Sequence, residues 1–134
     1  MKKKGVGMTN STAPYVRVYV DDDGESHFQD MEVTLNSVDY APPASPLDVS
    51  DAIDAHRFVF VGGAPGWVGD WHPSPKRQFV FVLSGVVEVT VSDGETRRFE
   101  PGSTVLLEDV TGRGHLSRLS SKEFTLTAMV HVES

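Results

Sequence analysis

Apolar residues in this chain occur in short runs that are rich in Val, Phe, Tyr and Thr and are bounded by Gly, Pro, Asp or Asn. Residues of these types favour extended strands, and the bounding residues favour turns. We predict strands at residues 15–20, in a segment that ends near 35, and at 56–61, 69–71, 78–83, 86–92, 96–99, 103–107, 115–118 and 124–131. This spacing of short strands is typical of an all-β sandwich or barrel.

Turn-forming residues show how the strands are joined. Asp21-Asp22-Asp23-Gly24 separates the first two predicted strands, so we expect an N-terminal hairpin. Asp93-Gly94 predicts a two-residue hairpin, because both residues tolerate positive φ. Several prolines oppose regular structure between residues 39 and 54 and predict a long loop across the barrel. A short helical turn at residues 47–55 is the alternative for part of this loop.

Length, charge and cysteine content limit the classes of partner and site. The chain has 134 residues, the size of one domain, and we expect a disordered tail at residues 1–13 followed by a single domain at 14–134. A net charge of −7 argues against a nucleic acid partner. No apolar run predicts a secretory signal or a membrane span, so a cytoplasmic location without membrane contact is expected. Cysteine is absent, so a metal site would need His, carboxylate or amide ligands.

Two histidines flank the central strands in a spaced pattern. His72 is followed by Ser74, by Gln78 at the start of a predicted strand and by Gly85 at its end, and His115 follows Gly112 by three positions. This order resembles the two motifs of the cupin superfamily, in which His, His, Glu and Gly are followed by a second motif with Gly, Pro, Gly, His and Asn. Ser74 stands at the second His position and Gln78 at the Glu position.

The second motif departs further from the family pattern. Val110 stands in place of the Pro, Leu119 replaces the Asn, and the preceding glycine is displaced to Gly102. The resemblance covers residues 56–131 and implies a cupin-type double-stranded β-helix, or jelly-roll, barrel with a pocket inside. It also implies a homodimer, and the extended segment at residues 15–35 is a natural candidate for crossing to the partner.

The retained motif residues suggest a mononuclear metal site. His72, Gln78 and His115 would hold a divalent ion such as iron, manganese, nickel or zinc. A neutral amide lacks the charge that offsets dehydration of such an ion. The missing carboxylate would come from Asp109 with its neighbour Glu108, or from Asp70. The sequence equally allows that no metal is bound.

Three functions are compatible with this pocket. The first is a small-molecule enzyme with dioxygenase, isomerase or lyase chemistry at the metal. The second is a metal-free cyclase or isomerase in which His72 or His115 acts as general acid or base and Gln78 orients the substrate. The third is a cupin that binds a ligand without turnover, in which His72, Gln78 and His115 form only a hydrogen-bonded polar cluster. We favour an enzyme.

Further residues are candidates for contact with the small-molecule ligand. Trp67 and Trp71 precede His72, and large aromatic side chains near a pocket mouth can stack on a ring. We assign substrate binding to Trp71. Arg113 lies between two glycines just before His115 and would bind a carboxylate, and Asp109 is the third predicted substrate-binding residue.

Overall fold

A computed structural model describes residues 11–132 of the chain, which form strands and no helix. The strands of these residues are β1 (Ser11–Val20), β2 (Ser26–Val38), β3 (Leu47–Val49), β4 (Arg57–Gly63), β5 (Gln78–Ser84), β6 (Val87–Val91), β7 (Thr96–Phe99), β8 (Thr104–Leu107), β9 (His115–Leu119) and β10 (Thr125–His131). The all-β prediction is therefore confirmed. No part of residues 11–132 forms a helix with the length and apolarity of a membrane span.

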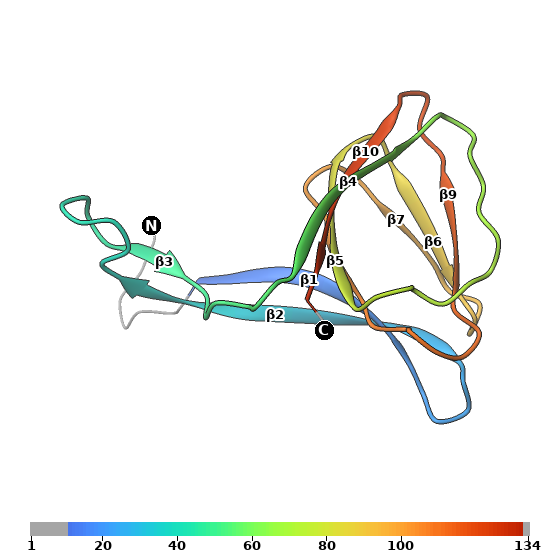
Figure 1. The fold of residues 1–134 in the computed structure, drawn as a ribbon, viewed down its shortest axis with the longest axis horizontal. Coiled ribbons are helices and arrows are strands. Elements are labelled where there is room, and N and C mark those ends of the chain that lie inside the picture. Colours follow the sequence, from blue (N-terminus) through green and yellow to red (C-terminus); the bar gives the residue numbers. More distant parts are fainter. Residues whose placement is uncertain (1–10, 133–134) are drawn as a thin grey trace.

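The strands form two sheets that enclose one core. The larger sheet has the order β3-β2-β1-β8-β5-β10-β4, and the smaller has the order β7-β6-β9. Figure 1 shows the two sheets facing each other as the walls of a barrel. Valines that alternate along β5 and β6 point into the space between the sheets, where Val18 of β1 and Val91 of β6 are fully buried.

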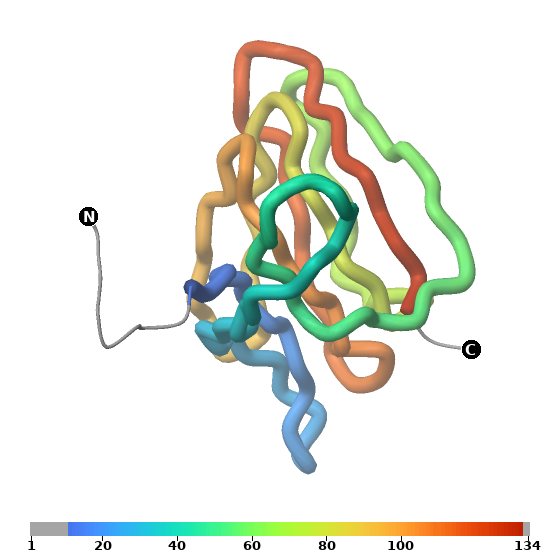
Figure 2. Tube along the Cα trace, turned by 90° about the vertical axis from the view of Figure 1, so that its left-hand side faces the viewer, coloured from blue at the N-terminus to red at the C-terminus, as the bar shows by residue number. Residues whose placement is uncertain are grey.

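The N-terminal hairpin extends beyond the barrel as an arm. β1 and β2 pair from Ser11–Leu35 to Val20–Ser26, as the turn residues predicted. β1 joins β8 only through Val16–Val18, in parallel pairing. The distal part of β1 and β2 therefore projects to one side, together with β3, in Figure 1, and it points toward the viewer in Figure 2.

Four expectations about local structure are wrong. The hairpin at Asp93-Gly94 is not a two-residue turn, because the Val91 N–H donates to the Glu95 carbonyl at 3.0 Å across a loop of residues 92–94, in which only Gly94 has a positive φ. The segment at residues 39–54 does not cross the barrel, because it lies largely at the end of the arm (Figure 1). The helical turn at residues 47–55 is absent, since Leu47–Val49 instead pairs with the edge of β2 at Asn36–Val38. Residues 69–71 form no strand and are held to β9 only by bridges at Val68 and His72.

The other predicted strands from residue 56 onward agree with the structure to within about two residues at either end, whereas β1 begins four residues before the predicted start at residue 15 and β2 continues to Val38, past the predicted end near residue 35. At the N-terminus, residues 11–13 lie in β1 and not in a tail, while residues 1–10 lie outside the described part of the chain.

Candidate functional site

A cavity of about 410 Å³ lies inside the barrel, between the two sheets. This volume is within the range of small-molecule pockets. Apolar side chains make up most of its wall, among them Val80, Val82, Val89, Leu107 and Met129. No Lys, Arg, Asp or Glu among residues 11–132 lines it. The cavity therefore suits an uncharged ligand with a large apolar part.

Polar side chains gather at one end of this cavity. His72, Ser74, Gln78 and His115 all line it, and they come from the start of β5, the start of β9 and the segment before β5. At the opposite end Thr125 and Thr127 also line it, but their hydroxyls already bond the backbone, with Thr127 Oγ1 donating to the Val61 carbonyl at 2.8 Å. The two histidines and the Gln78 amide thus lie at one end of the cavity, and the Ser117 side chain of β9 is a further polar group in its wall.

His115 and Asp109 form a buried pair at the polar end. Asp109 is 0% exposed and His115 is 3% exposed. His115 Nδ1 donates to Asp109 Oδ2 at 2.6 Å, so Nε2 is the ring nitrogen left for a ligand. The other carboxylate oxygen, Asp109 Oδ1, is buried without a hydrogen-bond partner among the described residues. A carboxylate in this position fixes the tautomer and orientation of the imidazole.

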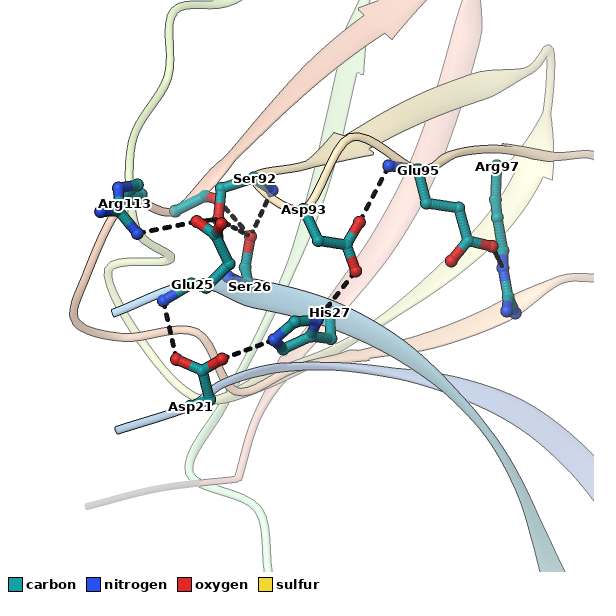
Figure 3. Close-up of polar contacts among 10 residues, drawn as sticks. Asp21, Glu25, Ser26, His27, Ser92, Asp93, Glu95, Arg97 and Arg113 are labelled. Carbon is teal, nitrogen blue, oxygen red and sulfur yellow. Dashed lines mark hydrogen bonds and ion pairs between the residues drawn. The ribbon is translucent and has the colours of Figure 1, made fainter. Parts of the chain in front are cut away.

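The loop before His115 is tied to the N-terminal hairpin. The buried hydroxyl of Ser26 donates to the Gly114 carbonyl at 2.7 Å, and the backbone N–H of Ser92 donates to the same hydroxyl at 2.7 Å. Figure 3 shows Ser26, Ser92 and Glu25 in one cluster, with Arg113 reaching Glu25 from the loop. Ser26, Ser92 and Gly114 belong to segments that are distant in sequence. Their hydrogen bonds fix the place where β9 begins, which is also the place of His115.

His72 lies beside His115 but is more exposed. The two residues exchange backbone hydrogen bonds of 3.1 and 3.0 Å, and their ring centroids are 5.2 Å apart. His72 Nδ1 donates to the backbone carbonyl of Asp70 at 2.7 Å. The two imidazoles, 43 positions apart in the sequence, are thus brought together as the family resemblance implied.

Gln78 and Ser74 form the remaining polar wall. Gln78 is 5% exposed, and its amide nitrogen donates to Ser74 Oγ at 3.2 Å. The Ser74 hydroxyl in turn donates to the Lys76 carbonyl at 2.6 Å. Since an amide carries two N–H donors and one oxygen acceptor, Gln78 keeps hydrogen-bonding capacity for a ligand.

The structure places the other predicted site residues outside the cavity wall. Trp71 and Asp70 are exposed and do not line the cavity. Arg113 is also exposed and does not line it, because its guanidinium donates to Glu25 Oε1 at 2.7 Å. Asp109 reaches the site through His115 and does not itself line the cavity.

Trp67 lines the cavity, whereas the sequence analysis assigned contact with the ligand to Trp71. The Trp67 ring lines the cavity and lies over Gly69, where a Cβ would come within 2.7 Å of the ring. A side chain at position 69 would push the ring aside, so the glycine leaves room for the tryptophan, and the pairing of Trp67 with Gly69 is a signal that the sequence contains.

The carboxylate of Glu108 forms ion pairs with two arginines and does not line the cavity. It accepts hydrogen bonds from Arg17 Nε and, at 2.5 Å, from Arg77 Nε. Burial raises the pKa of Glu108, but these two guanidinium groups outweigh burial and hold its pKa below the usual value. Glu108 therefore supplies no carboxylate to the cavity.

The residues present do not make a complete site for a divalent metal. No three His, Cys, Asp or Glu side chains gather in a metal-binding group within residues 11–132. His72, His115 and Gln78 would offer two imidazoles and one neutral amide, while the nearest carboxylate, that of Asp109, is bonded to His115 Nδ1. Such a set lacks the negative charge that usually compensates a divalent ion.

Comparison with known proteins identifies the family. The model of the EutQ-like cupin domain family matches residues 59–129, which is more than half of the chain. No curated protein sequence matches the chain.

Several solved structures are similar to this chain. A protein of unknown function from Rhizobium leguminosarum is 27% identical, with a TM-score of 0.49 over 57% of this chain and 69% of its own. A Cupin 2 conserved barrel domain protein from Salinispora arenicola is 19% identical, with a TM-score of 0.48 over 76% of each chain. A putative ethanolamine utilization protein Q from Salmonella typhimurium is 14% identical, with a TM-score of 0.38 over 92% of this chain and 98% of its own. By the extent of the family match, the chain belongs to the EutQ-like cupin domain family.

Proposed function

We propose that this cupin domain is a small-molecule enzyme that moves a proton within a neutral, mainly apolar substrate. The observation that carries the proposal is the buried Asp109–His115 pair, whose imidazole lines a mainly apolar cavity. In this proposal His115 is the catalytic acid and base, and Asp109 is a positioning residue that acts through it.

The geometry supports an isomerisation in which no oxidant or reductant is needed. A substrate carbonyl would accept a hydrogen bond from the Gln78 amide, which polarises the carbonyl and acidifies the neighbouring C–H bond. His115 Nε2 would remove that proton and return it to another atom of the same substrate, so the imidazole ends each cycle neutral. Asp109 would stabilise the imidazolium that forms between the two transfers.

The lining of the cavity favours one class of substrate. Its apolar length suits a small cyclic or branched carbonyl compound, and its polar end suits one oxygen function. A phosphate or dicarboxylate would lack a cationic partner there, because no Lys or Arg of residues 11–132 lines the wall. Phosphorylated sugars are therefore expected to be excluded.

Solvent exchange tests the proposal without knowledge of the final product. The domain would be incubated in D₂O with a set of neutral cyclic and branched ketones of five to ten carbons, and deuterium uptake would be followed by mass spectrometry. We expect uptake by some members, a loss of at least 100-fold in His115→Gln and a smaller loss in Asp109→Asn. Trp71→Phe, outside the cavity wall, is the matched control and should exchange normally.

Two other outcomes would favour the alternative functions. Ligand binding without any exchange would favour a cupin that binds without turnover. Near-stoichiometric iron, manganese, nickel or zinc in protein purified without chelator, lost in both His72→Ala and His115→Ala, would favour the metal enzyme built on His72, Gln78 and His115. Failure of every ketone to bind would contradict the proposed substrate class. The cytoplasmic location stays a prediction.

A further inference from the structure

The cavity reaches solvent on one side of the barrel. Its walls from the middle of the sheets are closed, since Val82 of β5 is 2% exposed and Val105 of β8 is 3% exposed. By contrast, Val61 of β4 is 41% exposed and Trp67 is 49% exposed, although both line the cavity. The other exposed residues of the lining are Gly62, His72 and Pro75. The cavity therefore opens between β4 and the segment that joins β4 to β5.

This joining segment forms one border of the opening. Leu119 of β9 accepts a hydrogen bond from the Gly66 N–H at 3.0 Å and donates to the Trp67 carbonyl at 2.9 Å. The Gly69 N–H donates to the Ser117 carbonyl at 2.9 Å. Residues 66–69 thus extend the small sheet beyond β9, and Figure 1 shows this green segment passing beside β9. We call the opening between β4 and residues 66–72 the side entrance.

The β4 border of the side entrance is made of small residues. β4 is the last strand of the large sheet among the described residues, so no strand covers its free edge. A Cβ at Gly63 would lie 2.5 Å from Cδ1 of Leu119, so Leu119 closes the entrance at that end. Val59 shares the inner face of β4 with Val61 and is 39% exposed. The entrance therefore continues along β4 toward Val59.

The Trp67 ring forms the opposite wall of the side entrance. A Cβ at Gly69 would lie 2.7 Å from Cη2 and 3.2 Å from Cζ3 of this ring, so the ring extends along the chain from position 67 to position 69. One side chain thereby fills the wall at both positions. The backbone beneath it is fixed, because the Trp67 N–H donates to the Ala64 carbonyl at 3.2 Å and its carbonyl accepts from Leu119. The ring therefore sets the width of the entrance on this side.

The rim of the side entrance is apolar. Val59 and Val61 of β4 face Trp67 and its neighbour Val68 across the opening, and all four are exposed. Contiguous exposed apolar surface of this kind marks an interaction site. A ligand with an apolar body gains favourable contact with valine and aromatic side chains as it passes this rim, since the contact removes apolar surface from water.

We propose that ligands reach the cavity through the side entrance, and that Trp67 is a specificity-determining residue whose ring limits the width of the ligand. A narrow ring can lie against the indole face. A wider ligand would overlap the indole, and close-packed groups cannot overlap. The proposal rests on the proposed function in that the same cavity takes the ligand, but it does not depend on the proton transfer.

Two uncharged alcohols of different width test the selectivity. Cyclohexanol and 2-adamantanol each carry one hydroxyl, and the second is much the wider. Neither has the acidified C–H bond of a ketone, so their binding is measured apart from proton transfer. Displacement of a bound apolar dye would give both dissociation constants. We expect Trp67→Ala to raise the affinity for 2-adamantanol relative to cyclohexanol at least tenfold, and Trp67→Phe to give an intermediate ratio, because each truncation removes part of the wall.

Trp71→Ala is the matched control, because Trp71 is 48% exposed and does not line the cavity. It should leave the ratio of the two dissociation constants as in wild type. Circular dichroism of the three variants would verify that they are folded. An unchanged ratio in folded Trp67→Ala, or an equal change in Trp71→Ala, would overturn the proposal.

Fluorescence tests whether the ligand contacts Trp67. The chain has two tryptophans, so Trp71→Phe leaves Trp67 as the single emitter. Saturating cyclohexanol should shift its emission to shorter wavelength and reduce its quenching by acrylamide at least twofold, because the bound ligand displaces water from the ring. Unaltered emission in protein that binds cyclohexanol would overturn the proposal, since the ligand would then lie away from the side entrance.

The outcomes separate this proposal from the proposed enzyme activity. Failure of both alcohols to bind wild type and Trp67→Ala would overturn the side entrance. The expected change in selectivity, without deuterium uptake by any ketone, would support the side entrance and contradict only the proton transfer.

Discussion

Gly114 packs so closely on the backbone of His72 that a Cβ at position 114 would lie 2.1 Å from the His72 carbonyl carbon. Gly114 also has a φ of +75°, which L side chains rarely adopt. The contact holds the two histidine-bearing segments together at the polar end of the cavity. Only glycine satisfies both the conformation and the distance.

We therefore expect Gly114→Ala to lower the free energy of unfolding by about 3 kcal/mol or more, since it combines backbone strain with a steric clash. Gly94→Ala is the control, because Gly94 has a φ of +102° and a Cβ at this position would have no atom within 4 Å. It should cost only about 1 kcal/mol, the strain alone. Urea unfolding would measure both, and equal losses would show that the contact with His72 is looser than described.

Replacing Asp109 should change which ring nitrogen of neutral His115 carries the proton. In wild type the Nδ1 proton faces the carboxylate at 2.6 Å, so ¹⁵N NMR should show the Nδ1–H tautomer whenever the ring is neutral. In Asp109→Asn the amide can face the ring with its N–H group and favour the other tautomer. We expect the tautomer signals of His115 to change accordingly. The same signals should be unaltered in Asp70→Asn, whose side chain is exposed.

Filling the cavity should remove ligand binding while the barrel stays folded. Val82 lines the cavity and is 2% exposed, so Val82→Phe would place a ring inside it at a cost of at most about 1–3 kcal/mol. Fluorescence titration with an apolar dye should then show at least a tenfold loss of affinity. Leu83→Phe, at the next and 48% exposed position, should bind the dye as wild type does. Equal binding by both variants would place the dye outside the barrel.

His27 should make stability depend on pH. Its ring bonds Asp21 at 2.7 Å and Asp93 at 2.8 Å, which joins the β1–β2 turn to the β6–β7 turn (Figure 3). The hydrogen bond to Asp21, followed by that to Asp93, raises the pKa of His27, and the hydrogen bond from His27 lowers the pKa of Asp21. The pKa of Asp93 is lowered by the backbone N–H of Glu95 and also by His27.

Because the pKa of His27 is higher in the folded protein than in the unfolded chain, its protonation adds to the stability of the fold. This contribution is fully present below the unfolded pKa of about 6.5 and is lost as pH rises through the folded pKa. A lowered aspartate pKa contributes above about pH 4 and is lost as pH falls through the folded value. The melting temperature of wild type should therefore exceed that of His27→Gln most between about pH 4 and 6.5. The effect is modest because the groups are partly exposed. His56→Gln, at an exposed position, is the control for loss of a histidine.

Local sequence signals predicted the barrel well. Alternation in β5 and the Asp93-Gly94 turn act over a few residues, so strand positions followed from them. The pairing of His72 with His115 also followed, because the family pattern fixes both positions relative to strand starts. The Leu47–Val49 strand was missed because it depends on an open edge of β2, and propensity within such a short segment cannot supply that information.

The sequence did not predict those parts of the site that depend on contacts between side chains distant in sequence. Arg113 was expected at the cavity, but Glu25, 88 positions away, draws its guanidinium elsewhere. Trp67 and Trp71 have similar local surroundings, and only the irregular path between them decides which ring reaches the cavity. Asp109 was predicted at the site, yet its bond to His115 depends on the loop geometry that Ser26 and Gly114 fix.

The parallel pairing of Val16–Val18 with Val105–Leu107 has a consequence for synthesis of the chain. On the ribosome, β1 is made early but cannot find its β8 neighbour until about 90 further residues have been added. During that interval the N-terminal hairpin has no barrel to join, and closing so long a loop is slow. Chaperones that shield nascent β-strands would therefore act mainly on the first hairpin, and slowing elongation before β8 should prolong its exposure.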